Sequence, residues 1–417
     1  MNTLDEWLSY LESMHPTEID LGLDRIKQVA DRLSLFPLAR EVIMVAGTNG
    51  KGTTCAYIES YASQLGKSSG VYSSPHLIRF NERIRIRNEE VGDQPLLKAF
   101  ECVEAARKEI SLTYFEFTTL AAFWLFKQAD LDVAILEVGL GGRLDAVNIV
   151  DADVSVVTSI GIDHESWLGS DIDVIGYEKA GIFRSGRPAV FGASDGPASV
   201  GAHATQIGAE FYQAGNAYQF DPAEGHWTWS MKNGSSLVGL SYPGFPVQNV
   251  AAALCAMATL NWSLNRETAN RAVEQVSIRG RMEAFEFNGV EGWLDVAHNP
   301  QAAAYLAEQL THKNLPRKPV AIIGCMSDKD ISGVIKQLEF VFDRWLCIDL
   351  PIDRALSSSE LKDKLINCGQ AATAFSDFQQ AFEAVAEETR NSPEETRKVV
   401  VLGSFFTVAE AISYYER

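Results

Sequence analysis

The chain has 417 residues, of which 46% are hydrophobic and 22% charged, and its formal net charge is -19. This length predicts two domains, and the composition is that of a globular protein. The acidic balance argues against nucleic acid and anionic membranes as partners. The first residues have neither a basic start nor an apolar run, so we expect no signal peptide. Six scattered cysteines without a C-x-x-C pair are typical of a reduced, cytoplasmic protein.

The first half of the chain alternates between predicted helices and strands. Apolar residues spaced by three and four predict helices at residues 4–13 and 23–35. A buried strand at 42–45 and a helix at 55–65 follow, then a strand at 70–73 and helices at 95–109 and 117–129. Nearly continuous apolar strands are expected at 132–138 and 154–160, with a helix at 172–183. Such alternation predicts a parallel sheet.

The pattern then changes. Alternation around Asn233-Gly234 predicts a small antiparallel patch at residues 226–240, followed by helices at 247–262 and 267–275. Residues 277–281 look like a linker, after which strands at 293–296, 320–324, 345–348 and 398–402 alternate with helices. We therefore expect an α/β protein with domains at residues 1–278 and 279–417. The first would hold a parallel sheet like that of P-loop ATPases, and the second would be Rossmann-like.

A glycine-rich loop, GTNGKGTT at residues 47–54, joins the strand at 42–45 to the next helix. Glycines let the backbone turn tightly and aim N–H groups at an anion, while Lys51 can reach the outer phosphates. The match to G-x-x-x-x-G-K-[ST] is imperfect, because Val45 takes the first glycine position and Gly52 the hydroxyl position. A plain connecting loop is the alternative. The predicted nucleotide-binding residues here are Thr48, Asn49, Gly50, Lys51, Gly52 and Thr53.

Lys51, Ser74, Glu137 and His164 lie at or after the carboxyl ends of predicted strands, the edge where parallel sheets bind ligands. Glu137 is costly to bury unpaired, so beside a phosphate loop it predicts an Mg²⁺ ligand, with capping of a backbone amide as the alternative. Chemistry alone favours a turn residue for Ser74 and a structural role for His164, because imidazole is an uncommon ligand for a hard cation. Lys179 by itself would be a solvated helix lysine.

Six motifs occur in the order seen in Mur ligases: GTNGKGTT, SSPHL, LEVGLGGRLDAVN, SIGIDH, EKAGIF and DVAHNP. Over nearly its whole length the chain resembles the folylpolyglutamate synthase family, and its bacterial bifunctional dihydrofolate synthase members most closely. The resemblance implies ATP-dependent ligation of L-glutamate to dihydropteroate and to the terminal glutamate of folates, through an acyl phosphate. It also implies a cytoplasmic monomer that uses ATP and two Mg²⁺ ions.

The resemblance further implies roles for single residues. Metal ligands would be Ser74, Glu137, His164 and Lys179, the last as a carbamate. The catalytic set would be Lys51, Glu137, His164 and Lys179. Further nucleotide contacts would be Asn249, Arg281 and Asp295. Since the last two lie in the linker and the second domain, ATP is expected to bind between domains. The dihydropteroate contacts would be Asp20, Leu21, Gly22 and Leu23, then Thr113, Tyr114, Phe115 and Glu116, then Leu144, Asp145 and Ala146. Phe115 could equally be core.

Two other functions stay open from the sequence. A peptidoglycan Mur ligase would carry a UDP-binding domain before the loop, and residues 1–46 are too few for a domain of typical size. A nucleotide switch needs no acceptor site, so Glu137, His164 and Lys179 argue against it. ATP turnover with and without dihydropteroate and glutamate separates the three.

Overall fold

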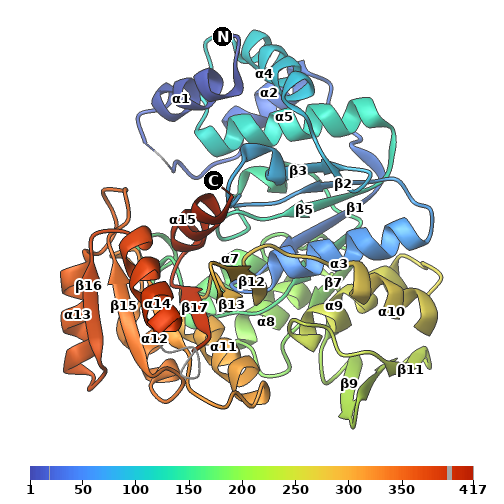
Figure 1. Ribbon diagram of the computed structural model, residues 1–417. Helices are drawn as coiled ribbons and strands as arrows, with labels where there is room; N and C mark the ends of the chain where they lie inside the picture. The colour runs from blue at the N-terminus through green and yellow to red at the C-terminus, as the bar shows by residue number, and fades with distance from the viewer. Residues whose placement is uncertain (18, 392–396, 417) are drawn as a thin grey trace. The chain divides into compact units, whose positions relative to one another are not determined.

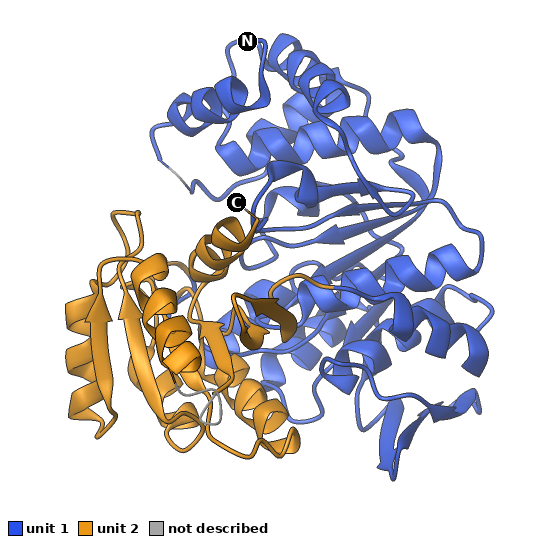
Figure 2. Ribbon diagram, viewed as in Figure 1, with its two compact units in different colours: residues 1–162, 168–277 blue, residues 163–167, 278–417 orange. Residues whose placement is uncertain are grey.

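The computed structural model describes residues 1–17, 19–391 and 397–416 (Figure 1). They divide into two compact units, which Figure 2 shows in different colours. Unit 1 comprises residues 1–162 and 168–277, and unit 2 comprises residues 163–167 and 278–417. The short segment 163–167, which carries His164, lies inside the predicted first domain but clusters with unit 2.

Unit 1 is built on an eight-stranded sheet with the order β4-β3-β2-β5-β1-β6-β7-β8. The six strands from β2 to β8 run parallel, and β3 and β4 add an antiparallel edge. Its strands are β1 (Ala39–Ala46), β2 (Ser69–Tyr72), β3 (Ile84–Ile86), β4 (Glu89–Glu90), β5 (Leu131–Glu137), β6 (Val154–Val157), β7 (Pro188–Phe191) and β8 (Glu210–Gln213). The predicted parallel sheet is confirmed, and β3, β4, β7 and β8 add to the strands predicted from the sequence.

Helices cover both faces of this sheet (Figure 1). One face packs against α1 (Leu4–Met14), α2 (Asp24–Arg32), α4 (Asp93–Arg107) and α5 (Tyr114–Ala129), and the other against α3 (Lys51–Gln64), α9 (Val247–Thr259) and α10 (Arg266–Gln275). Successive β1 residues alternate between the two cores, with Met44 in the first and Ile43 and Val45 in the second. This two-sided burial explains why β1 and β5 read as continuous apolar runs.

Unit 1 also contains shorter elements. Its other helices are α7 (Ile172–Ala180) and α8 (Ala198–Ile207), with the 3₁₀ turns η1 (Phe80–Arg83) and η2 (Ala146–Ile149), and α6 (Glu165–Leu168) lies where the two units meet along the chain. The predicted antiparallel patch is a three-stranded sheet of β9 (Tyr218–Ala223), β10 (His226–Met231) and β11 (Ser236–Leu240). Trp229 from β10 is fully buried and packs into the second core.

Two helices begin three or four residues before their predicted starts, and each difference has a local cause. Helix α3 begins at Lys51 rather than at 55, because Gly50 takes φ 88° at the N-cap and lets the helix start inside the glycine-rich motif. Helix α5 begins at Tyr114 rather than at 117. There Thr113 and Glu116 form a capping box, in which each side chain accepts a hydrogen bond from the other residue's backbone N–H.

Unit 2 contains a six-stranded sheet with the order β12-β13-β17-β14-β15-β16. Only the β12–β13 pair is antiparallel, and the rest are parallel, as expected of a Rossmann-like domain. Its strands are β12 (Glu283–Phe287), β13 (Val290–Leu294), β14 (Val320–Ile323), β15 (Arg344–Ile348), β16 (Ala372–Phe375) and β17 (Val399–Leu402), and its helices are α11 (Pro300–His312), α12 (Ile331–Leu338), α13 (Ser358–Asn367), α14 (Phe378–Asn391) and α15 (Phe405–Tyr415). Among the described residues, no helix is both long and apolar enough to span a membrane.

Candidate active site

The glycine-rich loop lies at the carboxyl edge of the unit 1 sheet. Strand β1 pairs in parallel with β5 and β6, so that Val45 lies opposite Glu137 and Ala46 opposite Val157. The loop that follows β1 therefore emerges beside the ends of both neighbours. It then enters α3, whose N-terminus adds unpaired N–H groups and the positive end of the helix dipole. This is the strand–loop–helix context that an anion needs.

Glycine is required at two loop positions. Gly47 has φ 145°, and a β-carbon there would lie 1.9 Å from Thr158 Oγ1. Gly50 has φ 88°, and its β-carbon would lie 2.4 Å from Asn249 Oδ1. The Thr158 hydroxyl in turn donates to Asn49 O at 2.7 Å, and Thr48 N donates to Ser159 O at 2.7 Å. The loop is thus held in one shape by the segment after β6 and by α9.

Two ammonium groups meet at one carbonyl of the loop. Lys51 Nζ donates to Gly47 O at 3.0 Å and to Thr48 O at 3.3 Å, and Lys179 Nζ donates to Gly47 O at 3.1 Å. Lys179 is only 6% exposed, so the alternative of a solvated helix lysine is wrong. In a chain of net charge -19, the Lys51 ammonium supplies local positive charge that a phosphate would require.

Glu137 ends β5 and faces the same loop. The carboxylate is 5% exposed and accepts a hydrogen bond from Ser74 N at 3.3 Å. A β-carbon on Gly52 would lie 3.6 Å from Glu137 Oε2, so the start of α3 borders the same oxygen. Ser74, Glu137 and the loop thus converge, as the strand order requires. A buried carboxylate beside a phosphate-binding loop fits a divalent cation.

His164 was predicted to lie in the first domain, but it clusters with unit 2. It follows β6 by seven residues, has φ 55° and belongs to segment 163–167 of unit 2. Within the described part of the chain, no group of three or more His, Cys, Asp and Glu side chains could hold a metal ion. The predicted metal set has only two such residues, Glu137 and His164. It therefore also depends on the Ser74 hydroxyl and on the oxygens of a carbamate on Lys179. That set stays a prediction.

The predicted nucleotide contacts fall in both units. Asn249, in the first turn of α9, is 7% exposed and lies against Gly50 in unit 1. In unit 2 the Arg281 guanidinium lies 5.8 Å from the centre of the Phe405 ring. Asp295 accepts hydrogen bonds from Met282 N and Ala297 N at 3.0 and 2.9 Å. Burial raises the pKa of Asp295, and the nearby Arg281 charge partly offsets that effect.

The three predicted dihydropteroate segments lie next to one another in unit 1. Arg25 joins the first to the second, because it pairs with Asp20 at 2.7 Å and with Glu116 at 3.2 Å. Phe115 borders the loop that leads to the third segment, since a β-carbon on Gly139 would lie 2.7 Å from its ring, and Asp145 accepts a hydrogen bond from Leu140 N in that loop. Each residue's part in binding stays a prediction.

The third segment contains a carboxyl with an unusual environment. Asp145 accepts hydrogen bonds from Leu140 N at 2.8 Å and Val147 N at 3.0 Å. Burial raises its pKa to about 6, although these hydrogen bonds act in the opposite direction. Asp145 also caps η2, whose first residue is Ala146. The carboxyl thus shapes the backbone that the prediction assigns to the substrate.

Comparison with known proteins decides the family. Residues 45–257 match the Mur ligase middle domain, and residues 280–405 match the glutamate ligase domain of Mur ligases. The dihydrofolate synthase/folylpolyglutamate synthase of Escherichia coli (strain K12) is 43% identical over 98% of this chain and 94% of its own length. That of Haemophilus influenzae is 41% identical over 98% and 96%. The chain belongs to this family of Mur ligases.

Solved structures of family members show the same fold over the whole chain. E. coli FolC in complex with DHPP and ADP aligns with a TM-score of 0.93 and 41% identity, covering 100% of this chain and 98% of that one. A bifunctional folylpolyglutamate synthase/dihydrofolate synthase with Mn, AMPPNP and L-glutamate bound aligns with a TM-score of 0.91 and 43% identity, over 100% and 99%. The predicted family and fold class are confirmed.

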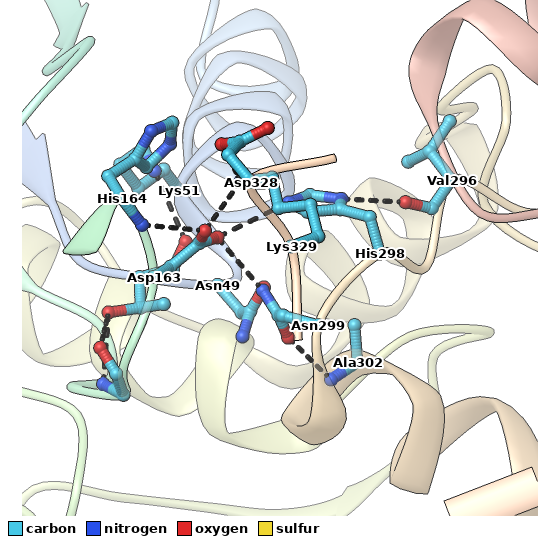
Figure 3. Close-up of polar contacts among 12 residues, drawn as sticks. Asn49, Lys51, Asp163, His164, Val296, His298, Asn299, Ala302, Asp328 and Lys329 are labelled. Carbon is cyan, nitrogen blue, oxygen red and sulfur yellow. Dashed lines mark hydrogen bonds and ion pairs between the residues drawn. The ribbon is translucent and has the colours of Figure 1, made fainter. Parts of the chain in front are cut away.

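This Mur ligase also contains a charged cluster in unit 2 that the sequence prediction did not single out (Figure 3). The Asp163 carboxylate accepts from Lys329 Nζ at 2.5 Å, from Asn299 Nδ2 at 3.2 Å and from the backbone N–H of His164 at 2.8 Å. His298 Nε2 lies 3.3 Å from the same carboxylate, and its Nδ1 lies 2.8 Å from a backbone carbonyl. Burial raises the pKa of Asp163, but His298 and Lys329 together hold it well below its usual range.

Part of this cluster had a sequence signal. Asp163 lies in the SIGIDH motif, and His298 and Asn299 lie in DVAHNP, where only Asp295 was assigned a role. Lys329 had none, because a lysine between two aspartates also reads as a solvated turn. The cluster ties the His164 segment to the start of α11 and to the loop before α12.

Proposed function

We propose that the chain ligates L-glutamate to dihydropteroate, which forms dihydrofolate, and to the terminal glutamate of folates, with hydrolysis of ATP to ADP and phosphate. One observation carries this proposal. Within unit 1, the loop with Lys51 and Lys179, the Glu137 carboxylate and three joined acceptor segments are parts of one α/β framework. The family names and the ligands in the relatives' structures support it.

The residues suit an acyl transfer through a phosphorylated carboxylate. The acceptor carboxylate takes the terminal phosphoryl group of ATP, and the amine of glutamate then attacks the acyl carbon and expels phosphate. Backbone N–H groups at the start of α3 and the Lys51 ammonium would bind and orient the phosphates. Glutamate would be bound by the predicted domain at residues 279–417 and the acceptor by residues 1–278, and the nucleotide contacts would be Asn249, Arg281 and Asp295.

We also propose Mg²⁺ as the divalent cation, with two ions per active site. Glu137, Ser74 and His164 would hold one, and a carbamate on Lys179 would serve the other. Bound Mg²⁺ supplies charge neutralisation between two anionic reactants. The Mn in a relative's structure supports a divalent cation at such a site. We further propose that the ligase works as a monomer in the cytoplasm.

The deciding experiment measures ADP release by purified protein. ATP and Mg²⁺ are combined with dihydropteroate and L-glutamate, with tetrahydrofolate and L-glutamate, and with each component left out in turn. We expect ADP and an amide product only when acceptor and glutamate are both present. ATP hydrolysis independent of any acceptor would instead favour a nucleotide switch, and turnover only with a nucleotide-sugar carboxylate would favour another Mur-type ligase. The Lys51→Ala variant is the control for contaminating ATPases.

A further inference from the structure

A polar cluster supports the loop that carries Asp20. Arg25, on the first turn of α2, places NH1 2.7 Å from Asp20 Oδ2 and donates from NH2 to Asp20 O at 2.8 Å. One guanidinium therefore fixes both the side chain and the backbone of Asp20. The planar, rigid fork of arginine makes such a double contact possible, whereas a lysine offers a single point of charge.

The same guanidinium reaches a second predicted substrate segment. Arg25 NH2 also donates to Glu116 Oε1 at 3.2 Å, while Glu116 Oε2 accepts from Thr113 N at 2.8 Å in the capping box of α5. The Glu116 side chain is only 4% exposed, so its charge needs a partner. Arg25 thus joins the Asp20 loop rigidly to the helix start that carries Tyr114 and Phe115.

His15 supports Asp20 from the other side. Its Nε2 lies 3.2 Å from Asp20 Oδ2, and its Nδ1 lies 2.8 Å from Ser111 Oγ. A neutral imidazole satisfies both contacts when Nε2–H donates to Asp20 and Nδ1 accepts from the Ser111 hydroxyl. Both side-chain donors to Asp20 therefore converge on Oδ2. The other oxygen, Oδ1, accepts no hydrogen bond from the described residues, and the side chain is 41% exposed.

We propose that Arg25 and His15 are positioning residues that hold Asp20 ready for the pterin of dihydropteroate and so set the use of this acceptor. The inference rests on the proposed function. A carboxylate held at one oxygen presents the other to the adjacent N–H donors on the edge of a flat heterocycle. Misplacing such a group by about 1 Å is enough to lose binding or turnover.

The simpler explanation is that Arg25 only docks α2 onto its neighbours, and the chain offers a matched control. Arg32 lies on the same helix, and its side chain is 31% exposed, against 29% for Arg25. It donates to Ala106 O and Arg107 O at 2.9 Å and to Glu109 at 3.0 Å, none of which is a predicted substrate residue. Loss of either arginine removes docking contacts of α2, but the acid that pairs with Arg32 is 73% exposed, and only Arg25 touches Asp20.

The experiment compares Arg25→Met, Arg25→Lys, His15→Gln and Arg32→Met with the wild-type chain, at saturating ATP and glutamate. We expect Arg25→Met to raise KM for dihydropteroate by about tenfold to a hundredfold, the equivalent of one or two charge-assisted hydrogen bonds, with little change in kcat. Arg25→Lys should recover part of this loss, and His15→Gln, which leaves the Arg25–Glu116 pair in place, should raise KM less. KM for tetrahydrofolate should rise less in every case.

Arg32→Met should lower Tm less than Arg25→Met, because Glu109 is 73% exposed and Glu116 only 4%, and it should leave KM for dihydropteroate unchanged. An unchanged KM in both Arg25→Met and His15→Gln, with wild-type turnover intact, would overturn the inference and leave the proposed function standing. An equal rise of KM in Arg32→Met would reduce Arg25 to a docking role and overturn it too. A wild-type chain that does not turn over dihydropteroate would instead overturn the proposed function, and the inference with it.

Discussion

Replacing Gly50 by alanine should destabilise the fold through two separable effects. Gly50 has φ 88°, a conformation that costs an L-residue about 1–2 kcal/mol. The new methyl would also lie 2.4, 2.7 and 2.8 Å from three side-chain atoms of Asn249, well inside van der Waals contact. Overpacking of this kind costs about 1–3 kcal/mol. The free energy of unfolding should therefore fall by about 2–5 kcal/mol.

A second glycine near the other end of the same helix isolates the backbone effect. Gly66 has φ 70°, yet a β-carbon there meets nothing within 4 Å. Gly66→Ala should therefore cost only the conformational part, about 1–2 kcal/mol. The difference between the two variants measures the contact with Asn249.

Removing Asn249 tests that contact directly. Asn249→Ala deletes all three clashing atoms, so Gly50→Ala/Asn249→Ala should be more stable than the sum of the single effects by about 1–3 kcal/mol. Urea denaturation of the four proteins gives this coupling energy. The double variant should still fail in ligation, because Asn249 is a proposed nucleotide contact. Additive single effects, within about 0.5 kcal/mol, would refute the steric explanation, as would an equal cost for Gly66→Ala.

Four further predictions concern chemistry. Lys51→Ala and Glu137→Ala should each lower turnover by about a hundredfold or more, with circular dichroism and Tm little changed. Near-normal turnover in either variant would show that the replaced residue is not part of the active site. If Lys179 is a carbamate, short carboxylic acids but not alkylamines should partly restore Lys179→Ala, and amine rescue alone would contradict the carbamate. Asp20→Asn should reduce kcat/KM for dihydropteroate more than for tetrahydrofolate, and equal losses would count against its assignment. Burial raises the pKa of Asp145 to about 6, so the stability that its protonated form contributes should be lost as pH rises from about 4 to about 6. The free energy of unfolding, measured by urea titration, should fall by up to about 3 kcal/mol over this range, and Asp145→Asn should reduce that pH dependence.

The sequence by itself determined the α/β class and the family. Strands β1 and β5 are buried on both faces, so their apolar runs are visible without any knowledge of their partners. The glycine-rich loop could be found in the same way, because glycines at positions that take positive φ are visible in the sequence itself. Glu137 could be found for a related reason, since a carboxylate that ends an apolar strand stands out against its neighbours.

Only the tertiary structure decided which distant side chains meet. Lys179 and Gly47 are 132 positions apart, and Arg25 and Glu116 are 91 positions apart. Neither contact leaves a periodic signal, because a helix lysine or arginine reads the same whether it is solvated or buried. The Asp163 segment likewise clusters with residues far along the chain, through charges of opposite sign. Periodicity reports which face of an element is buried, whereas the partner of a polar side chain depends on how the whole sheet and its helices pack.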